Sequence, residues 1–415
     1  MDRTVVLNIH PTPEQASILQ RTLLEHTACF NAVVYEGFTQ HCSNGVELHK
    51  QTYYPLRAAY PDLPAQLVCA ARVKATETVK SALTWQKKNE QNYPKRVAKA
   101  LKRGKPAPVF KPVKYPYVQY CPIRYDARSY WLRWESLICS FATVAGRVEL
   151  AFTVPIHAQK YIGSKVCSAD LCYRKGIWRL HVTVSVPEPA IAPSQEVIGV
   201  DLGLNRPAVT SNKHFLGERR WKERERRIFR LRRKLQAKGT KSAQSHLKKL
   251  SGKLLRQRKD HDHVLSKCIV QNATPGSTIV LENLTHIRES STIGKSKTND
   301  NKRRLHSWSF AQLYSFLSYK AEEHGITVVK VDPRHTSQTC SKCGYQARNN
   351  RRSQSLFHCR SCDYQLNADF NAALNIRNKY VASLAQDGTP VLSAPLSSDV
   401  SCPLDSSGEI QAPAL

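Results

Sequence analysis

Hydrophobic and polar positions change their periodicity along the chain, and each change predicts a different kind of element. The opening segment TVVLNI alternates in the manner of a short strand. Residues 11–38 then predict a helix with a capping box at its first turn. Thr12 serves as the N-cap, Pro13 as the first helical residue and Gln15 as the reciprocal partner of the cap.

The next changes of pattern predict a boundary between two parts of the chain. A second helix is expected at residues 63–85, and residues 86–117, rich in Lys, Arg and Pro, predict an extended linker instead of a helix. Residues 118–186 contain short alternating segments such as SYWLRW and GRVELAFTV, which predict a β-barrel or sandwich. The opening strand is expected to join this sheet, which makes the helices an insertion. The proline-rich residues 187–196 mark the boundary.

After the boundary, strands and helices alternate in an order that predicts a fold class. Three strands are expected at EVIGVDLG, AVTSN and HFLG, followed by basic helices, the strand STIVLENL, a helix at residues 307–325 and the strand ITVVKVD. A cysteine-rich module follows, and a last helix begins near Asn367. This order of elements is RNase H-like. Residues 381–415, rich in Ser, Pro and Ala, predict a disordered tail.

The charge of the chain predicts a polyanionic partner. The 415 residues, enough for two or three domains, include 63 Lys and Arg against 32 Asp and Glu, a net charge of +31. Ribosomal or membrane-surface binding would need the same sign, but the basic residues between 219 and 259 recur on every side of the predicted helices. A membrane-surface helix would need an apolar face, so nucleic acid is favoured. No apolar run of 18 residues and no signal peptide is found, so we expect a soluble, cytosolic protein.

Four of the 13 cysteines have the spacing of a zinc site. Nine are scattered, and an odd total argues against a complete disulfide framework. Burial of free thiols as small apolar side chains predicts no particular spacing. The remaining four follow the pattern C-x2-C-x15-C-x2-C, which predicts a closed, structural zinc site: Cys340, Cys343, Cys359 and Cys362.

Three acidic residues occupy unexpected positions in apolar segments. Asp201 interrupts VIGVDLG, Glu282 closes TIVLE, and Asp369 shares a helical face with Ala372, Ala373 and Ile376 in the last predicted helix. Each acid alone could be a turn or cap residue. In an RNase H-like sheet, however, the three elements meet at one point, where mutual repulsion favours two divalent cations, Mg²⁺ or Mn²⁺, about 4 Å apart. Such a centre cleaves phosphodiesters.

Basic and aromatic residues suggest where nucleic acid binds. Between residues 219 and 260 the chain has 18 Lys or Arg and three acids, and like charges at i, i+4 destabilise a helix unless phosphates neutralise them. A solvated charged face is the alternative. Four aromatic residues near the linker could stack on bases or anchor the sheet: Tyr93, Phe110, Tyr115 and Tyr117. The candidate phosphate-binding residues are Lys95, Arg96, Lys102, Arg103, Arg226, Arg227, Arg230, Arg232, Arg233 and Lys234. His261 and His263 are two residues apart on a predicted helix, face different directions and are not expected to bind metal.

Four segments, IGVDLGLNRPAVTS, IVLENLTHIRE, VDPRHTSQTCSKCG and FHCRSCDYQLNADFNAALNIR, closely resemble the TnpB (OrfB) proteins of insertion sequences, which are ancestor-like relatives of type V CRISPR effector nucleases. The resemblance implies a RuvC-like nuclease with Asp201, Glu282 and Asp369 as catalytic acids. It also implies a monomer in a prokaryotic cytoplasm, associated with the nucleoid. Such a protein binds a guide RNA transcribed from the element and cuts double-stranded DNA paired to the guide, beside a short motif.

The resemblance further implies a division into domains. An N-terminal wedge-like β-barrel would be interrupted by a helical recognition insert, and the nuclease would carry an inserted zinc ribbon. The expected ranges are 1–10 and 110–190 for the barrel, 11–109 for the insert and basic linker, 191–335 for the first part of the nuclease with basic helices at 217–272, 336–366 for the zinc-binding insert, 367–380 for the last nuclease helix and 381–415 for the tail.

Two positions depart from the family's pattern, and three other functions compete with the guided nuclease. The family often has Gly where this chain has Asp363, and Asp or His where it has Asn367. A nuclease-independent RNA-guided regulator would not need the three acids. A transposase that joins DNA strands is disfavoured by the cysteine module before Asp369. A structural RNA-binding protein would explain the charge and the zinc site but not the acids.

Overall fold

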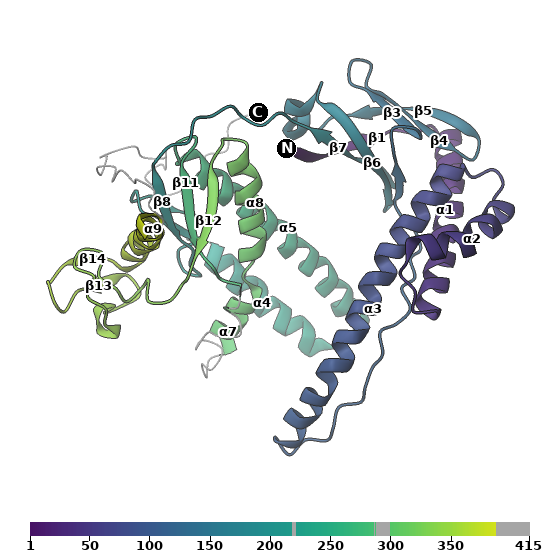
Figure 1. Cartoon of the computed structure of the whole chain (residues 1–415). Coiled ribbons are helices and arrows are strands. Elements are labelled where there is room, and N and C mark those ends of the chain that lie inside the picture. The colour runs from purple at the N-terminus through teal and green to yellow at the C-terminus, as the bar shows by residue number, and fades with distance from the viewer. Residues whose placement is uncertain (218–220, 286, 288–298, 387–415) are drawn as a thin grey trace. The chain divides into compact units, whose positions relative to one another are not determined.

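The computed structural model describes residues 1–217, 221–285, 287 and 299–386 (Figure 1). The chain divides into two compact units, Met1–Pro187 and Glu188–Leu415, and the division falls in the proline-rich stretch. No helix among these residues is both long enough and apolar enough to cross a membrane.

The first unit is built on a nearly closed antiparallel sheet of seven strands. As predicted, the opening strand β1 joins this sheet. It lies between β7 and β5, so the sheet combines residues from both ends of the unit. Alternate side chains such as Leu7, Phe141 and Leu180 fill its core. The strands, in the order β2-β6-β7-β1-β5-β4-β3, are β1 (Asp2–Ile9), β2 (Ile123–Tyr125), β3 (Tyr130–Arg133), β4 (Ile138–Thr143), β5 (Gly146–Thr153), β6 (Lys165–Arg174) and β7 (Ile177–Ser185).

Three helices are inserted between β1 and β2: α1 (Pro13–Thr39), α2 (Gly45–Ala59) and α3 (Ala65–Leu101). The predicted capping box of α1 is confirmed. The Gln15 amide donates to Thr12 Oγ1 at 3.3 Å, and the Thr12 amide donates to Gln15 Oε1 at 2.9 Å. Helix α2 was not predicted from the sequence, although Asn44 caps it by accepting from the Val46 amide.

The prediction of an extended linker was wrong for residues 86–101, which continue α3. Pro94 cannot donate a backbone hydrogen bond, but the residues around it are mostly Lys, Arg, Gln and Ala, which are strong helix formers. Beyond Leu101 the chain returns along the helix, where Asn89 Nδ2 donates to the Lys111 carbonyl at 2.6 Å. The Tyr93 and Phe110 rings pack edge to face at 5.1 Å.

The aromatic residues of the returning segment also hold it on α1. Tyr115 donates its hydroxyl to the Asn31 carbonyl at 3.0 Å, and its ring packs edge to face on Tyr35 at 5.9 Å. These contacts anchor the segment to helices. The two alternatives considered from the sequence were stacking on bases and anchoring of the sheet. Tyr117 remains 70% exposed.

The second unit contains a five-stranded mixed sheet whose order of elements matches the prediction. Strands β9 and β10 pair antiparallel and β9 pairs antiparallel with β8, whereas β8, β11 and β12 are parallel. In the order β10-β9-β8-β11-β12, the strands are β8 (Val197–Asp201), β9 (Ala208–Thr210), β10 (Phe215–Leu216), β11 (Thr278–Glu282) and β12 (Thr327–Val331).

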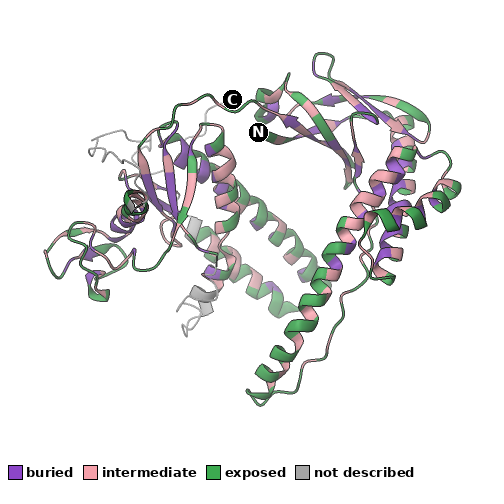
Figure 2. Ribbon diagram, in the orientation of Figure 1, coloured by how far each residue is buried: buried purple, intermediate pink, exposed green. Residues whose placement is uncertain are grey.

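The helices of this unit cover both faces of its sheet. Ile198 and Val200 of β8 share a core with Leu265 of α5 (Lys241–Gln271) and Leu317 of α8 (Phe310–Glu322). Gly199, between them, faces α9 (Ala368–Gln386) on the other side. The buried central strands β8 and β11 contrast with the mostly exposed α4 (Trp221–Lys238) in Figure 2. A short α7 (Asn299–Ser307) precedes α8.

The predicted disordered tail starts too early. Helix α9 continues through Val381 to Gln386, because this segment contains Ala, Leu and Gln and no Gly or Pro. The rest of the predicted tail, residues 387–415, lies outside the described residues. The cysteine module between β12 and α9 contains a short hairpin of β13 (Leu356–His358) and β14 (Gln365–Asn367), and its small core includes Phe357.

Candidate active site and zinc centre

Asp201 and Glu282 lie at the carboxyl ends of two neighbouring parallel strands. The register of β8 and β11 pairs Gly199 with Val280 and Val200 with Leu281, so Asp201 and Glu282 follow in the same row. Because alternate residues of a strand face the same side, both acids share the face of Gly199. This face is the one that α9 covers.

Helix α9 approaches β8 so closely that position 199 has no room for a side chain. A Cβ atom there would overlap the Ala373 carbonyl oxygen and lie 2.6 Å from the Arg377 amide nitrogen. Asp369 lies one turn before Ala373, in the first turn of the helix. Glycine at 199 therefore lets α9 bring Asp369 to the end of the strand that bears Asp201.

Asp201 interacts electrostatically with the other two acids. Burial raises the pKa of Asp201 well above its usual value, and the charges of Glu282 and Asp369 raise it further, while Arg351 opposes them. Burial also raises the pKa of Glu282, against the hydrogen bond from Thr336. The structure thus brings together the three acids that the sequence pattern singled out.

Sequence reasoning missed two partners of these acids. Arg351 Nη2 donates to Asp369 Oδ1 at 2.9 Å, and Thr336 Oγ1 donates to Glu282 Oε1 at 2.5 Å. Arg351 is one of several basic residues in a loop, and Thr336 stands next to a serine, so neither had a distinguishing local pattern. Only the fold reveals which acid each residue contacts.

The donor set at this site fits divalent cations. It consists of carboxylate oxygens, which are the ligands that Mg²⁺ and Mn²⁺ prefer, and a buried carboxylate beside two others is stabilised in its ionised form by a cation. Thr336 donates a hydrogen bond to Glu282 Oε1, and Arg351 donates one to Asp369 Oδ1. The carboxylates are not gathered as tightly as the thiols of the cysteine cluster.

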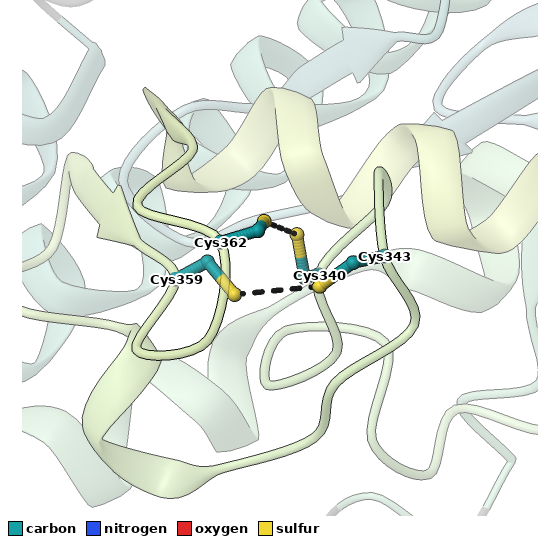
Figure 3. Close-up of side chains that lie close together, drawn as sticks. All are labelled: Cys340, Cys343, Cys359 and Cys362. Atoms are coloured by element: carbon teal, nitrogen blue, oxygen red, sulfur yellow. Dashed lines mark hydrogen bonds between the residues drawn. The ribbon is translucent and has the colours of Figure 1, made fainter.

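The four predicted cysteines converge from two loops of the cysteine module (Figure 3). Their sulfur atoms all lie within 4.8 Å of one another, with Cys340 and Cys362 at 3.8 Å and Cys343 and Cys359 at 3.6 Å. Tetrahedral Zn–S bonds of about 2.3 Å place sulfurs about 3.8 Å apart. The Ser361 amide donates to Cys359 Sγ at 3.4 Å, which favours a thiolate. The four-cysteine cluster therefore fits a zinc ribbon.

The two departures from the family pattern have structural roles. Asp363 has φ +53°, in the left-handed region where glycine is favoured and Asp is better tolerated than most residues, and its carboxylate contacts His358 at 3.1 Å. Asn367 caps α9, because its Oδ1 accepts from the amides of Asp369 at 3.0 Å and Phe370 at 3.1 Å.

The candidate phosphate-binding residues are nearly all exposed. On α4, five of the six are exposed, and Arg232 is half-buried with its guanidinium 5.5 Å from the Phe229 ring. Leu235 of α4 packs against Ala243 and Leu250 of α5 in a small apolar cluster. This cluster holds together α4 and α5, which we call the basic hairpin. The four basic residues predicted near the linker lie at the end of α3 and just beyond it, also exposed.

Of His261 and His263, which are not expected to bind metal, the second has a packing role. The His263 ring stacks on Phe316 at 3.8 Å. Between the two histidines, the buried Asp262 accepts hydrogen bonds from Ser309 at 2.6 Å and Gln312 at 2.8 Å, which fixes α5 to α8.

Two family models match parts of this chain. Residues 310–376 match the model described as "Cas12f1-like, TNB domain", and residues 180–285 match OrfB_IS605, described as "Probable transposase". The CRISPR-associated endodeoxyribonuclease Cas12f1 of Sulfoacidibacillus thermotolerans is 33% identical over 222 residues, which cover 49% of this chain and 50% of that protein. The TnpB-like protein MJ0751 of Methanocaldococcus jannaschii is 34% identical over 134 residues, 32% of this chain and 46% of that protein.

The chain spans about half the length of these relatives. A solved structure, a Cas12f1–sgRNA–target DNA complex, is similar over 89% of this chain and 84% of that chain, with a TM-score of 0.59 and 17% identity. This similarity concerns the fold. Together the family models and the relatives confirm the resemblance noted in the sequence: over parts of its length, the chain is similar to the TnpB-like proteins, to the OrfB group and to the Cas12f1 proteins.

Proposed function

We propose that this protein is an RNA-guided DNA endonuclease of an insertion sequence, which cuts DNA complementary to a bound guide RNA beside a short motif. The observation that carries the proposal is the meeting of Asp201, Glu282 and Asp369, from β8, β11 and α9, where burial and the other two acids raise the pKa of Asp201. Burying three carboxylates close together costs folding free energy, and a regulator or a structural RNA-binding protein does not require such a cluster. The name of the Cas12f1 relative, an endodeoxyribonuclease, supports the same activity.

The proposal assigns a part to each region of the chain. The five-stranded sheet and α9 form a RuvC-like nuclease, with residues 191–335 and 367–380 as its two parts and residues 336–366 as a structural zinc insert. In the first unit, the seven-stranded sheet of residues 1–10 and 110–190 acts as the wedge-like barrel, and residues 11–109 form the recognition insert. Support comes from the similar fold of a Cas12f1 protein, whose structure was solved with sgRNA and target DNA.

The active-site acids would hold two Mg²⁺ or Mn²⁺ ions. When bound, such ions activate a water molecule and stabilise the leaving oxygen of a phosphodiester. Asp201, Glu282 and Asp369 would supply the ligands, and the cations would offset the repulsion among these carboxylates. Arg351, at 2.9 Å from Asp369, orients that carboxylate and adds positive charge beside the scissile phosphate.

The basic surface would hold the guide RNA and the DNA backbone. The net charge of +31 and the exposed basic residues of α3 and α4 suit a long polyanion better than a short duplex contact. Base pairing with the guide would supply target specificity, since phosphate contacts carry little sequence information. We propose that the protein works as a monomer in a prokaryotic cytoplasm, at the nucleoid.

The proposal is tested by purifying the protein with its nucleic acid and measuring metal-dependent cleavage. Asp201→Ala, Glu282→Ala or Asp369→Ala should each abolish cleavage while RNA affinity stays nearly unchanged, because the acids hold metal and other residues hold RNA. Sequencing of the copurified RNA should yield one structured species with a variable end. Robust cutting by an alanine variant would remove that residue from the site.

A further inference from the structure

One stripe of α9 binds the segment that joins β12 to the first cysteine pair. We call this segment, residues 332–341, the strap. Asn371, Asn375 and Lys379 are spaced by four residues and therefore lie along one helical face. Asn371 Nδ2 donates to the Thr339 carbonyl at 2.9 Å, and its Oδ1 accepts from the Ser341 amide at 3.1 Å.

The other two residues of the stripe continue the attachment toward β12. Asn375 Nδ2 donates to the carbonyls of Thr336 at 2.8 Å and Thr339 at 2.7 Å. Lys379 donates to the carbonyls of Asp332, at 3.0 Å, and Arg334. Asn371 and Asn375 are 0% and 6% exposed, and buried amides keep such hydrogen bonds because losing them leaves polar groups unsatisfied. The strap is thus fixed to the helix that bears Asp369.

Thr336 connects the strap to the active site. Its side chain is buried, at 3% exposure of the residue, and its hydroxyl donates to Glu282 Oε1 at 2.5 Å, with the Pro333 carbonyl 3.1 Å away as the alternative acceptor. A hydrogen bond to an ionised carboxylate is short and about twice as strong as a neutral one. It restricts the rotation of the carboxylate and uses one of its two oxygens, Oε1.

We propose that Thr336 is a positioning residue of the metal site, whose hydroxyl orients the Glu282 carboxylate, and that the α9 stripe holds it there. The inference rests on the proposed function, because it gives Glu282 the role of a metal ligand. Partners that orient metal ligands typically contribute 10- to 100-fold to metal affinity. The strap also contains Cys340, so it joins the zinc cluster to Glu282 through one continuous, hydrogen-bonded segment.

The test compares full-length Thr336→Val, which removes the hydroxyl and keeps the shape, with Thr336→Ser, which keeps the hydroxyl. Mn²⁺ binding is measured by electron paramagnetic resonance, zinc content by metal analysis, and cleavage as a function of Mn²⁺ concentration. We expect Val to weaken Mn²⁺ binding and raise the Mn²⁺ midpoint for cleavage about tenfold. Ser should stay within about threefold of the unsubstituted protein. Zinc content should be unchanged in both variants.

Equal Mn²⁺ binding and equal midpoints for Val and the unsubstituted protein would overturn the inference. Thr336→Ala repeats the comparison with a smaller side chain. If both Val and Ala lose zinc while Ser retains it, the hydroxyl supports only the strap, and the inference also fails. Asp201→Ala separates this failure from that of the proposed function: if it leaves Mn²⁺ binding intact, the acids do not form a metal site and both ideas fall together.

Discussion

Replacing Gly199 with alanine should displace α9 from β8 and disable the active site. The new Cβ would overlap the Ala373 carbonyl oxygen and lie 2.6 Å from the Arg377 amide nitrogen, whereas ordinary contacts are 3.4–4 Å. Both atoms belong to helix backbone, which cannot rotate away, so α9 must withdraw by about 1 Å to relieve the overlap. Overpacking of this kind costs about 1–3 kcal/mol of folding free energy. A shift of about 1 Å in Asp369 should slow cleavage by about 100-fold.

Thermal unfolding and single-turnover cleavage measure the two effects. Gly252→Ala is the matched control, because Gly252 lies in α5 and, among the described residues, a Cβ there would meet only the Arg256 guanidinium, at 3.5 Å. That exchange should stabilise the protein by about 0.5–1 kcal/mol, since alanine is the better helix former. Unchanged stability and cleavage in Gly199→Ala would refute the close approach of α9 and, with it, the geometry of the site.

Three further predictions concern the zinc cluster, the charge of Asp201 and the basic hairpin. Cys340→Ser or Cys359→Ser should lower bound zinc and expose residues 336–367 to protease; metal analysis that finds no zinc in freshly purified protein would contradict this. The raised pKa of Asp201 means that its contribution to stability is present at low pH and is lost as pH rises through the folded pKa. Asp201→Asn should therefore raise the melting temperature in EDTA at pH 7, and a lower value would contradict the placement of the acid. Replacing basic residues between 226 and 234 with glutamine should flatten the salt dependence of RNA binding, by about 0.7–0.9 in slope for each lost phosphate contact; an unchanged slope would exclude α4 from the interface.

The sequence predicted the features that depend on short-range patterns. The cysteine spacing and the acids in apolar segments are visible within a few residues, and the order of strands and helices in the second unit follows from periodicity. The error at residues 86–101 came from treating Pro94 as a helix breaker, when the surrounding helix formers and the packing of Tyr93 on Phe110 outweigh one lost hydrogen bond.

The contacts that position the acids could not be predicted in this way. The hydrogen bond from Thr336 to Glu282 joins residues 54 positions apart in the sequence. The hydrogen bond from Arg351 to Asp369 depends on the path of the cysteine module. Asn371 and Asn375 did leave a signal, because two asparagines four residues apart are poor helix formers inside an apolar helix. Their spacing indicates that both side chains lie on one helical face, but it does not indicate which segment they bind.

The most direct test of guided cleavage exchanges the guide. The protein is purified with its RNA, the variable end of that RNA is replaced by an unrelated sequence, and cleavage of two DNA duplexes that match either the old or the new sequence is measured in Mg²⁺. Guided cleavage predicts that cutting moves to the DNA that matches the new guide, and that Asp201→Ala cuts neither duplex. Equal cutting of both duplexes, or cutting by RNA-free protein at the same rate, would contradict it.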